Sequence, residues 1–309
     1  MKPPSRRLLL WLALPVLLMA VAVWSWTPRE PSWEGRSLSS WLEDLETDTR
    51  GKLGAVGEQN AEAAERAIQG MGTNCLPSLL RRLGQLKPSP LEKKLIRLEQ
   101  QLRTHEVSVP WDSTENRLIL QWDALHSAFK ALGHAAAPLV PELERWLASS
   151  VEEKAGAAAQ VLALIHPEGT AALVRASTNR TIASRFIILV MLDQLTPQHP
   201  EMLAAILRMA DDPDAHIRGH LGHTLSKYES EAASVLPVLV RLLGDTDHLV
   251  RQSALIGLYQ FKGDVRAAES ALTALIANPG VKHSIAEQGL LKKIKAQSVT
   301  PPPLTPAPP

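Results

Sequence analysis

The chain has 309 residues, of which 45% are hydrophobic and 21% charged, so it has enough apolar side chains for an extended folded core. Its 33 basic and 32 acidic residues leave a formal net charge of +1, which supplies no sequence-wide positive field and argues against nucleic acid as a partner. The single Cys75 excludes an internal disulfide and is expected to be a small buried residue, not a nucleophile.

Residues 1–26 are predicted to direct export as a signal anchor or a signal peptide. Basic residues precede an apolar run from Leu8 to Trp26. As a helix this run would be about 28 Å long, close to the ~30 Å hydrocarbon core of a bilayer. The positive-inside rule then predicts a single-pass anchor in a bacterial inner membrane, with the rest of the chain in the periplasm. Ala20-Val-Ala22 also fits a cleavage site, so a secreted or periplasmic product is the alternative.

The segment after this run is expected to form a stem over residues 27–36 and then a helix. Gly35 is expected to turn the chain, and a serine to cap the helix that follows. The apolar face of this helix consists of Leu38, Trp41, Leu42 and Leu45. Such a helix would cover the open end of a helical array. Trp33 and Trp41 could instead form a docking motif, so both are candidate interaction residues.

Two turns in the first half of the chain share one pattern. Gly72 is followed five residues later by Pro77, and Gly133 by Pro138, as expected where glycine ends one helix and proline opens the next. The two glycines lie 61 residues apart, which predicts an insertion at residues 86–112. A strongly charged helix within this insertion carries a narrow stripe made by Leu91, Leu95, Leu98 and Leu102.

A 33-residue unit repeats in the second half of the chain. Asp211–Leu243 has the pattern of two helices, each with one apolar stripe. The residues from Gly244 onward repeat its first half, with Arg251 in the place of Arg218. A helix pair of this size cannot bury both stripes alone, so neighbouring copies are expected to stack and share a core.

The repeated Asp-x-Asp-x-x-Val-Arg pattern resembles the HEAT repeat, including the short form known from phycobilisome lyases. The segments around Trp33, Gly72 and Ser89 are also similar to exported HEAT-repeat proteins of verrucomicrobial and planctomycete bacteria. The resemblance implies an all-α fold, an α-solenoid of about five to six HEAT-like helical hairpins over residues 37–295, preceded by the N-terminal hydrophobic helix. Residues 296–309 are rich in proline and are expected to form a disordered tail.

His216, His220 and His223 have the spacing of metal ligands on one helical face. The first and last of them are about 10 Å apart along a helix, so at most a pair, His216 and His220, could bind one ion. The 33-residue offset maps all three onto ordinary repeat positions. A structural role is therefore favoured, and no metal or other cofactor is predicted.

Arg218 and Arg251 recur at one repeat position beside Asp212 and Asp245. In HEAT arrays such residues resemble an inter-repeat ladder, in which the arginine of one unit meets the aspartate of the next. The alternative is that this ridge binds an acidic ligand.

No phosphate-binding loop, Cys-x-x-Cys pair or Gly-x-Ser-x-Gly elbow is present in the sequence, and no catalytic residue is predicted. The chain is therefore predicted to be an exported, membrane-anchored scaffold and not an enzyme. It would bind an unidentified protein through a concave groove lined by the second helix of each pair. The alternatives are an extracytoplasmic enzyme of lyase-like or metal-assisted type on the same fold, and a purely structural spacer.

Overall fold

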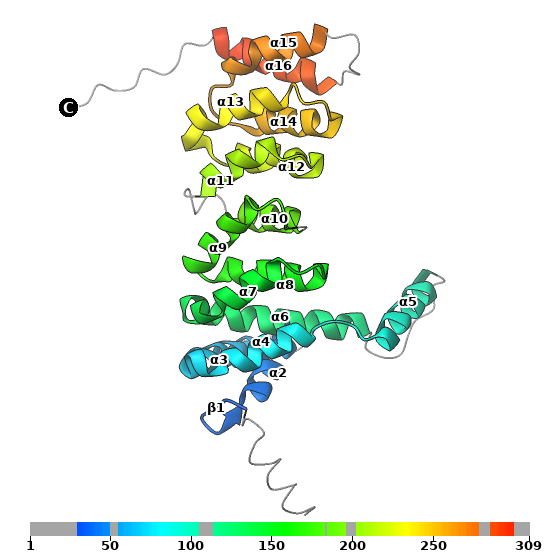
Figure 1. Ribbon diagram of the computed structural model, residues 1–309, viewed down its shortest axis with the longest axis vertical. Coiled ribbons are helices and arrows are strands. Elements are labelled where there is room, and N and C mark those ends of the chain that lie inside the picture. The colour runs from blue at the N-terminus through cyan, green and yellow to red at the C-terminus, as the bar shows by residue number, and fades with distance from the viewer. Residues whose placement is uncertain are drawn as a thin grey trace, which may run out of the picture. The chain divides into compact units, whose positions relative to one another are not determined.

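The computed structural model describes residues 30–49, 55–104, 114–182, 184–195, 202–277 and 285–299. The described chain is almost entirely helical, which confirms the all-α prediction in its main point (Figure 1). The predicted anchor at residues 8–26 and residues 300–309 of the predicted tail lie outside these residues. Residues 296–299, which were predicted to belong to the disordered tail, instead form the end of the last helix. Within the described ranges, none of the helices combines the length and the apolar character needed to cross a bilayer. The chain divides into two compact units, Met1–Leu132 and Gly133–Pro309, called unit 1 and unit 2 below.

Unit 1 begins with a short hairpin and continues with helices. Its elements are β1 (Ser32–Trp33), β2 (Arg36–Ser37), α2 (Leu38–Thr49), α3 (Ala55–Met71), η1 (Gly72–Cys75), α4 (Leu76–Gln85), α5 (Pro90–Thr104) and α6 (Thr114–Leu132). Helix α2 packs against α3 and α6, whereas α5 contacts the beginning of α6 and projects away from α2, α3 and α4 (Figure 1).

Within the described residues, the hairpin β1–β2 departs from the all-α prediction. Ser32 pairs with Ser37 and Trp33 with Arg36 in an antiparallel register. Glu34 and Gly35 connect them with φ angles of 50° and 78°, the left-handed values that a two-residue hairpin turn requires. Each strand is only two residues long, so no period-two pattern could reveal it in the sequence.

Helix α2 begins where the hairpin ends, and its predicted buried face is confirmed. The backbone N–H of Ser40 donates to Ser37 Oγ at 3.3 Å, which caps the helix. The side chains that the helix buries, each at most 6% exposed, are Leu38, Trp41, Leu42 and Leu45. Burial of these four side chains fixes which face of α2 is turned toward the core.

Both predicted glycine turns have the conformation that favours glycine. Gly72 and Gly133 have φ angles of 53° and 48°, which a residue with a side chain rarely adopts. Cys75 follows the first turn, is fully buried as predicted, and donates its thiol to Gly72 O at 3.0 Å. Burial raises the pKa of Cys75 to about 11, so the thiol stays protonated at neutral pH.

Unit 2 is a series of helix pairs that Figure 1 shows as successive layers. Its elements are η2 (Gly133–Leu139), α7 (Val140–Leu147), α8 (Glu152–Leu164), α9 (Glu168–Ser177), α10 (Arg185–Leu195), α11 (Leu203–Arg208), η4 (Met209–Asp211), α12 (Ala215–Ser226), η5 (Glu229–Glu231), α13 (Ala232–Leu242), α14 (His248–Gln260), η6 (Arg266–Ala268), α15 (Glu269–Ala277) and α16 (Ile285–Val299). Helices α10, α12 and α14 are the first helices of three consecutive pairs, and α11, α13 and α15 are the second helices.

The 33-residue repeat is visible in the way that α12 and α14 begin and pack. Asp214 and Asp247 cap the two helices by accepting the N–H groups of His216 and Leu249 at 2.9 and 2.8 Å. The predicted stripe is buried, and it consists of Ile217, Leu221 and Leu225 of α12 and of Tyr228, which follows the helix. The inward stripes of adjacent pairs therefore share one core within unit 2, as the repeat predicts.

Helices α12 and α14 cross at two glycines. A Cβ atom added to Gly222 would lie 2.0 Å from the carbonyl oxygen of Ser253, and one added to Gly257 would lie 2.3 Å from the carbonyl oxygen of Gly222. Neither position can hold a side chain unless the backbones separate. The absence of a side chain thus sets the close spacing of these two first helices.

Candidate functional site

A chain of arginine–aspartate pairs links consecutive repeats of unit 2. Arg218 donates to both carboxylate oxygens of Asp245, at 2.8 and 2.9 Å. One repeat earlier, Arg185 donates to Asp212 at 3.2 Å. The side chains of Arg218 and Asp245 are only 14% and 11% exposed, so this pair is largely shielded from water. The structure thus brings the arginine of one repeat to the aspartate of the next.

The same arginines also hold the loops from which they emerge. Arg218 donates through Nη1 to the carbonyl oxygens of Asp212 and Pro213, at 2.7 and 3.1 Å. Arg251 makes the equivalent bonds to Asp245 and Thr246, at 2.8 and 2.9 Å. The position one repeat beyond Asp245 is Asn278, which lies outside the described residues. These bonds tie the loop before each first helix to the helix itself.

The electrostatic consequence is clearest at Asp245. Its hydrogen bonds from Arg218 hold the pKa of the carboxyl below its ordinary value, an effect that burial opposes. Asp245 in turn raises the pKa of Arg218. Because the two charges satisfy each other, the geometry of this ridge is that of a structural contact between repeats.

Arg185 was not predicted as a ladder residue, although it precedes Arg218 by the same 33 residues. Its own loop shows why. Asn179 stands where Asp212 stands in the next repeat, so the Asp-x-Asp pattern is lost there. The local fold is nevertheless kept, because Asn179 Oδ1 accepts the N–H of Thr181 at 3.1 Å, as Asp212 accepts that of Asp214 at 2.9 Å.

The histidines of α12 lie against neighbouring first helices. The ring of Phe186 on α10 meets the ring of His220 edge-on, with centroids 5.6 Å apart. His220 Nε2 is 3.9 Å from Asp193, a buried carboxylate that also accepts from Lys227 at 2.9 Å. His223 Nδ1 is 3.3 Å from the side-chain oxygen of Gln260 on α14.

Burial is the main cause that lowers the pKa of His220. Asp193 acts in the opposite direction, whereas His223 and Lys227 reinforce the effect of burial. Burial therefore favours the neutral form of the His220 imidazole. Within the described ranges, no group of three or more His, Cys, Asp or Glu side chains is placed to hold a metal ion, and this includes the surroundings of His216 and His220.

A cleft of about 280 Å³ lies over the first helices α10, α12 and α14. The residues that line it are Phe186, Ala215, His216, Gly219, His220, Asp247 and Leu249. It is hollow because α12 presents small residues there: a Cβ at Gly219 would meet only Val250 Cγ2, at 3.9 Å. The cleft is thus framed by two imidazoles and by the apolar side chains of Phe186 and Leu249.

Four exposed apolar side chains lie on the first helices α10 and α14, and two of them, Phe186 and Leu249, line the cleft. Phe186 and Leu249 are 44% and 51% exposed, and Ile256 and Tyr259 farther along α14 are 44% and 59% exposed. In the described parts of α11, α13 and α15, by contrast, no large apolar side chain is exposed. We call these four residues together with the cleft the first-helix surface. The exposed apolar area thus lies on the first helices, whereas the sequence led us to expect binding by the second helices.

The sequence contained a signal for this surface. Leu249 and Ile256 occupy the repeat positions of His216 and His223, and all four lie outside the buried stripes of their helices. An apolar side chain at such a position costs solubility without adding to the core, which is a reason to suspect an interface.

The two tryptophans proposed as interaction residues have different surroundings in unit 1. Trp41 is 6% exposed and lies beneath the guanidinium of Arg36, whose carbon is 3.7 Å from the ring centroid. Trp33 is 39% exposed and packs against Gly70 of α3. Of the two, Trp33 therefore keeps the larger surface available to a partner.

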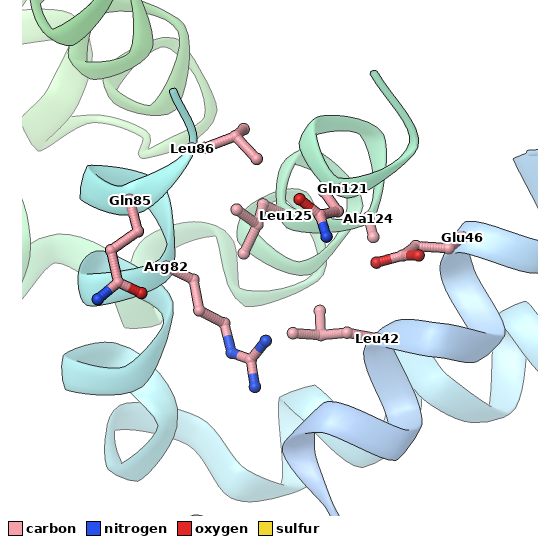
Figure 2. A pocket seen from close by; sticks show the side chains of 8 residues that line it. All are labelled: Leu42, Glu46, Arg82, Gln85, Leu86, Gln121, Ala124 and Leu125. Atoms are coloured by element: carbon pink, nitrogen blue, oxygen red, sulfur yellow. The ribbon is translucent and has the colours of Figure 1, made fainter. Parts of the chain in front are cut away.

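Unit 1 also contains a small pocket between α2, α4 and α6 (Figure 2). Its volume is about 170 Å³, below the ~300 Å³ at which small-molecule sites begin. Arg82 of α4 extends toward Leu42 of α2, and its guanidinium donates to Glu30 at 2.8 Å and to Ser39. The charge of Arg82 is thus used to attach α4 to the segment that leads into α2.

Repeated helix pairs, a buried charge ladder and a shared core define unit 2 as a helical repeat array. Residues 183–259 match the family model for HEAT repeats. The matched segment includes α10, α12 and α14, and with them the ladder and the first-helix surface. A search of curated proteins finds no match to the chain. The match and the helical fold together support a HEAT-repeat protein, whereas the resemblance to particular bacterial groups stays a prediction.

Proposed function

We propose that the chain is a HEAT-repeat scaffold that binds a protein partner through the first-helix surface of unit 2. HEAT arrays commonly mediate protein–protein interaction by presenting an extended surface. The observation that carries the proposal is the row of exposed apolar side chains beside an open cleft on α10, α12 and α14. Exposed apolar patches with aromatic residues are typical of protein interfaces.

The size and chemistry of the cleft favour a protein over a small substrate. At about 280 Å³ it can accept one or two side chains of a partner but is smaller than most sites for small molecules. Asp247 uses its carboxylate to cap α14, and burial lowers the pKa of His220. The carboxylate of Asp247 thus anchors a helix, and the imidazole of His220 offers a flat polar ring. Both roles suit recognition of a partner better than acid–base chemistry.

The proposal includes attachment to a membrane by the apolar run Leu8–Trp26, with unit 2 in the periplasm. Its support is the length of the run and the basic residues that precede it in the sequence. Cell fractionation followed by N-terminal sequencing of the mature chain would distinguish this anchor from a cleaved signal peptide. Recovery of the mature chain in the cytoplasm would contradict both forms of export.

The partner-binding part can be tested by site-specific photo-crosslinking of the full chain in the source cells. A photoreactive residue replaces Leu249 on the first-helix surface or, as a control, the exposed Ser234 on α13. We expect a near-stoichiometric crosslink to one protein from position 249 and none from position 234. Equal crosslinking from both positions would contradict the proposed surface.

A matched pair of substitutions in the cleft sharpens this test. Gly219→Leu fills the cleft, whereas Gly219→Ala adds one methyl group where the nearest atom is 3.9 Å away. Both replace glycine within a helix by a good helix former, so both variants should fold. We expect Gly219→Leu to abolish the crosslink from position 249 and Gly219→Ala to retain it. A crosslink that survives Gly219→Leu would show that the partner does not use the cleft.

A further inference from the structure

Helix α5 of unit 1 exposes three of the four leucines in the stripe that its sequence predicts, and the fourth, Leu102, is half-buried. Leu91, Leu95 and Leu98 are 68%, 40% and 49% exposed, on one face of a helix of 15 residues. Exposure on this scale is unusual for three leucines of one helix, because an amphipathic helix normally buries its apolar stripe. The described part of unit 1 thus leaves an apolar surface on α5 uncovered.

The helix itself is firmly specified at its start. Ser89 and Glu92 form a reciprocal capping box: Ser89 N–H donates to Glu92 Oε2 at 2.7 Å, and Glu92 N–H donates to Ser89 Oγ at 3.2 Å. Glu92 also pairs with Arg117 of α6, and Glu99 accepts the N–H of Thr114 at 3.5 Å. These contacts fix the face of α5 that is turned toward α6.

The same contacts sort the charges of α5. Both of its acidic residues are engaged: Glu92 is bound at the cap and to Arg117, and Glu99 is only 4% exposed. Lys93, Lys94 and Arg97 are all exposed. The exposed surface of α5 therefore combines an apolar stripe with three cations, whereas Glu99 is buried and Glu92 is paired with Arg117.

This combination is complementary to an anionic lipid surface. A helix that lies in a membrane interface inserts its apolar face among the acyl chains, and its lysines and arginines attract acidic headgroups. A second copy of the chain is a poorer occupant, because its α5 would bring an equally cationic surface against this one. The stripe also spans only about two heptads, which is short for a stable coiled coil.

We propose that α5 binds the surface of an anionic bilayer, with Leu91, Leu95 and Leu98 inserted and Lys93, Lys94 and Arg97 at the headgroups. The inference goes beyond the scaffold function and does not rest on it. It gives unit 1 a lipid contact of its own, independent of the run Leu8–Trp26. Attachment through both α5 and the run Leu8–Trp26 would keep unit 1 at a fixed orientation to the membrane.

The test reads the environment of α5 alone, because the N-terminal apolar run would itself bring the full chain to lipid. Leu95→Cys is labelled with an environment-sensitive fluorophore in the full-length protein. Labelling is selective, because Cys75 is buried and its pKa is raised to about 11. Gln100→Cys on the polar side of α5 is the matched control. The proteins are reconstituted into phosphatidylglycerol–phosphatidylethanolamine vesicles or phosphatidylcholine vesicles.

We expect the fluorophore at position 95 to shift to the blue and to be quenched by brominated lipid in the anionic vesicles only. The fluorophore at position 100 should remain water-exposed in both. Replacing Lys93, Lys94 and Arg97 by glutamine should abolish the shift at position 95, while far-UV circular dichroism stays unchanged.

Three outcomes would overturn the proposal. A probe at position 95 that stays water-exposed in anionic vesicles would show that α5 does not insert. An equal shift in neutral vesicles, or one that survives the glutamine substitutions, would remove the role of the cations. A shift in detergent without lipid that increases with protein concentration would identify a second copy as the occupant.

Discussion

Units 1 and 2 use the same kinds of contact in different ways. In unit 2 the same contact recurs after 33 residues: Arg185 donates a hydrogen bond to Asp212, and Arg218 donates to Asp245. In unit 1 the charged contacts are single: Arg36 reaches Ser40 and Asp44 over the ring of Trp41, and nothing in the described part of the unit repeats this arrangement. Repetition makes the contacts of unit 2 predictable from one copy, whereas those of unit 1 depend on its particular ends and insertion.

The two units differ most in how they tolerate a side chain at a glycine. In unit 2 a Cβ at Gly222 would lie 2.0 Å from the backbone carbonyl oxygen of Ser253, whereas in unit 1 the atoms nearest to a Cβ at Gly70 belong to the ring of Trp33, at 2.6 Å. A half-exposed ring can move, but the backbone of a packed helix cannot. We expect Gly222→Ala to lower the free energy of unfolding by about 3 kcal/mol, and Gly70→Ala to change it by about 1 kcal/mol or less.

Denaturant unfolding followed by circular dichroism measures both variants, and hydrogen exchange assigns the loss to α12 and α14. Gly219→Ala is the control within α12, since its Cβ meets only Val250 at 3.9 Å. We expect this control to gain about 0.5 to 1 kcal/mol from helix propensity. If Gly222→Ala were as stable as Gly219→Ala, the close crossing of α12 and α14 would be wrong.

The second prediction compares an arginine from each unit. Arg218→Met leaves Asp245 without its bidentate partner in a largely buried site and should cost about 2 kcal/mol. Arg82→Met in unit 1 removes an ion pair to Glu30 whose side chains are 37% and 29% exposed, and should cost about 1 kcal/mol or less. Chemical denaturation at pH 7 measures both costs.

Acid provides a check on the same pair. Because Arg218 lowers the pKa of Asp245, the stabilisation is present above the unfolded pKa, about 3.9, and is lost as the pH falls through the lower folded pKa. The difference in the free energy of unfolding between the wild type and Arg218→Met should therefore shrink below pH 4.

Arg241→Met is the surface control. The side chains of Arg241 and its partner Asp211 are 53% and 66% exposed, so loss of this pair should cost about 0.5 kcal/mol. Equal costs for Arg218→Met and Arg241→Met would remove the energetic role of the ladder.

Much of the fold could be predicted wherever periodicity carries the information. The buried stripe of α12 and the glycine turn at Gly72 follow from residue spacing and from the conformational freedom of glycine. The hairpin at Ser32–Ser37 could not be predicted, because two-residue strands have no period. Nor could the crossing of Gly222 and Gly257, because a crossing point depends on how two helices pack and not on either sequence alone.

The candidate site was less predictable than the fold. The leucine stripe of α5 could be seen in the sequence, but its exposure could not, because the same pattern is typical of a buried face. The sequence places Leu249 and Ile256 at repeat positions outside the buried stripe, but only the structure shows how far they are exposed. A repeat pattern specifies which residues are equivalent, whereas exposure depends on what each copy packs against.

Each unit contains a histidine whose pKa is lowered chiefly by burial, and a change at the neighbouring carboxylate should shift that pKa only slightly. In unit 1 the pKa of His126 is influenced by the charges of Lys130 and Asp123. Both residues belong to the same helix as His126, α6. In unit 2 the carboxylate that faces His220 is Asp193, which comes from α10 of the preceding repeat, and His223 and Lys227 add positive charge. The carboxylate that acts on His220 thus comes from a stacked neighbouring repeat, whereas the one that acts on His126 comes from the same helix.

Asp193→Asn tests this difference directly. Loss of the carboxylate removes the one influence that raises the pKa of His220, so this pKa should fall further while that of His126 stays unchanged. NMR titration of the imidazole signals in the full chain measures both pKa values.

The folded pKa of His220 lies below its unfolded value of about 6.5. The unfolded state therefore binds more protons as the pH falls through this range, and the free energy of unfolding should decrease from pH 7 to pH 5. His220→Gln should reduce that decrease. A titration of His220 above pH 6.5 would instead show that Asp193 outweighs burial, and the cleft would then carry a positive charge at mildly acidic pH.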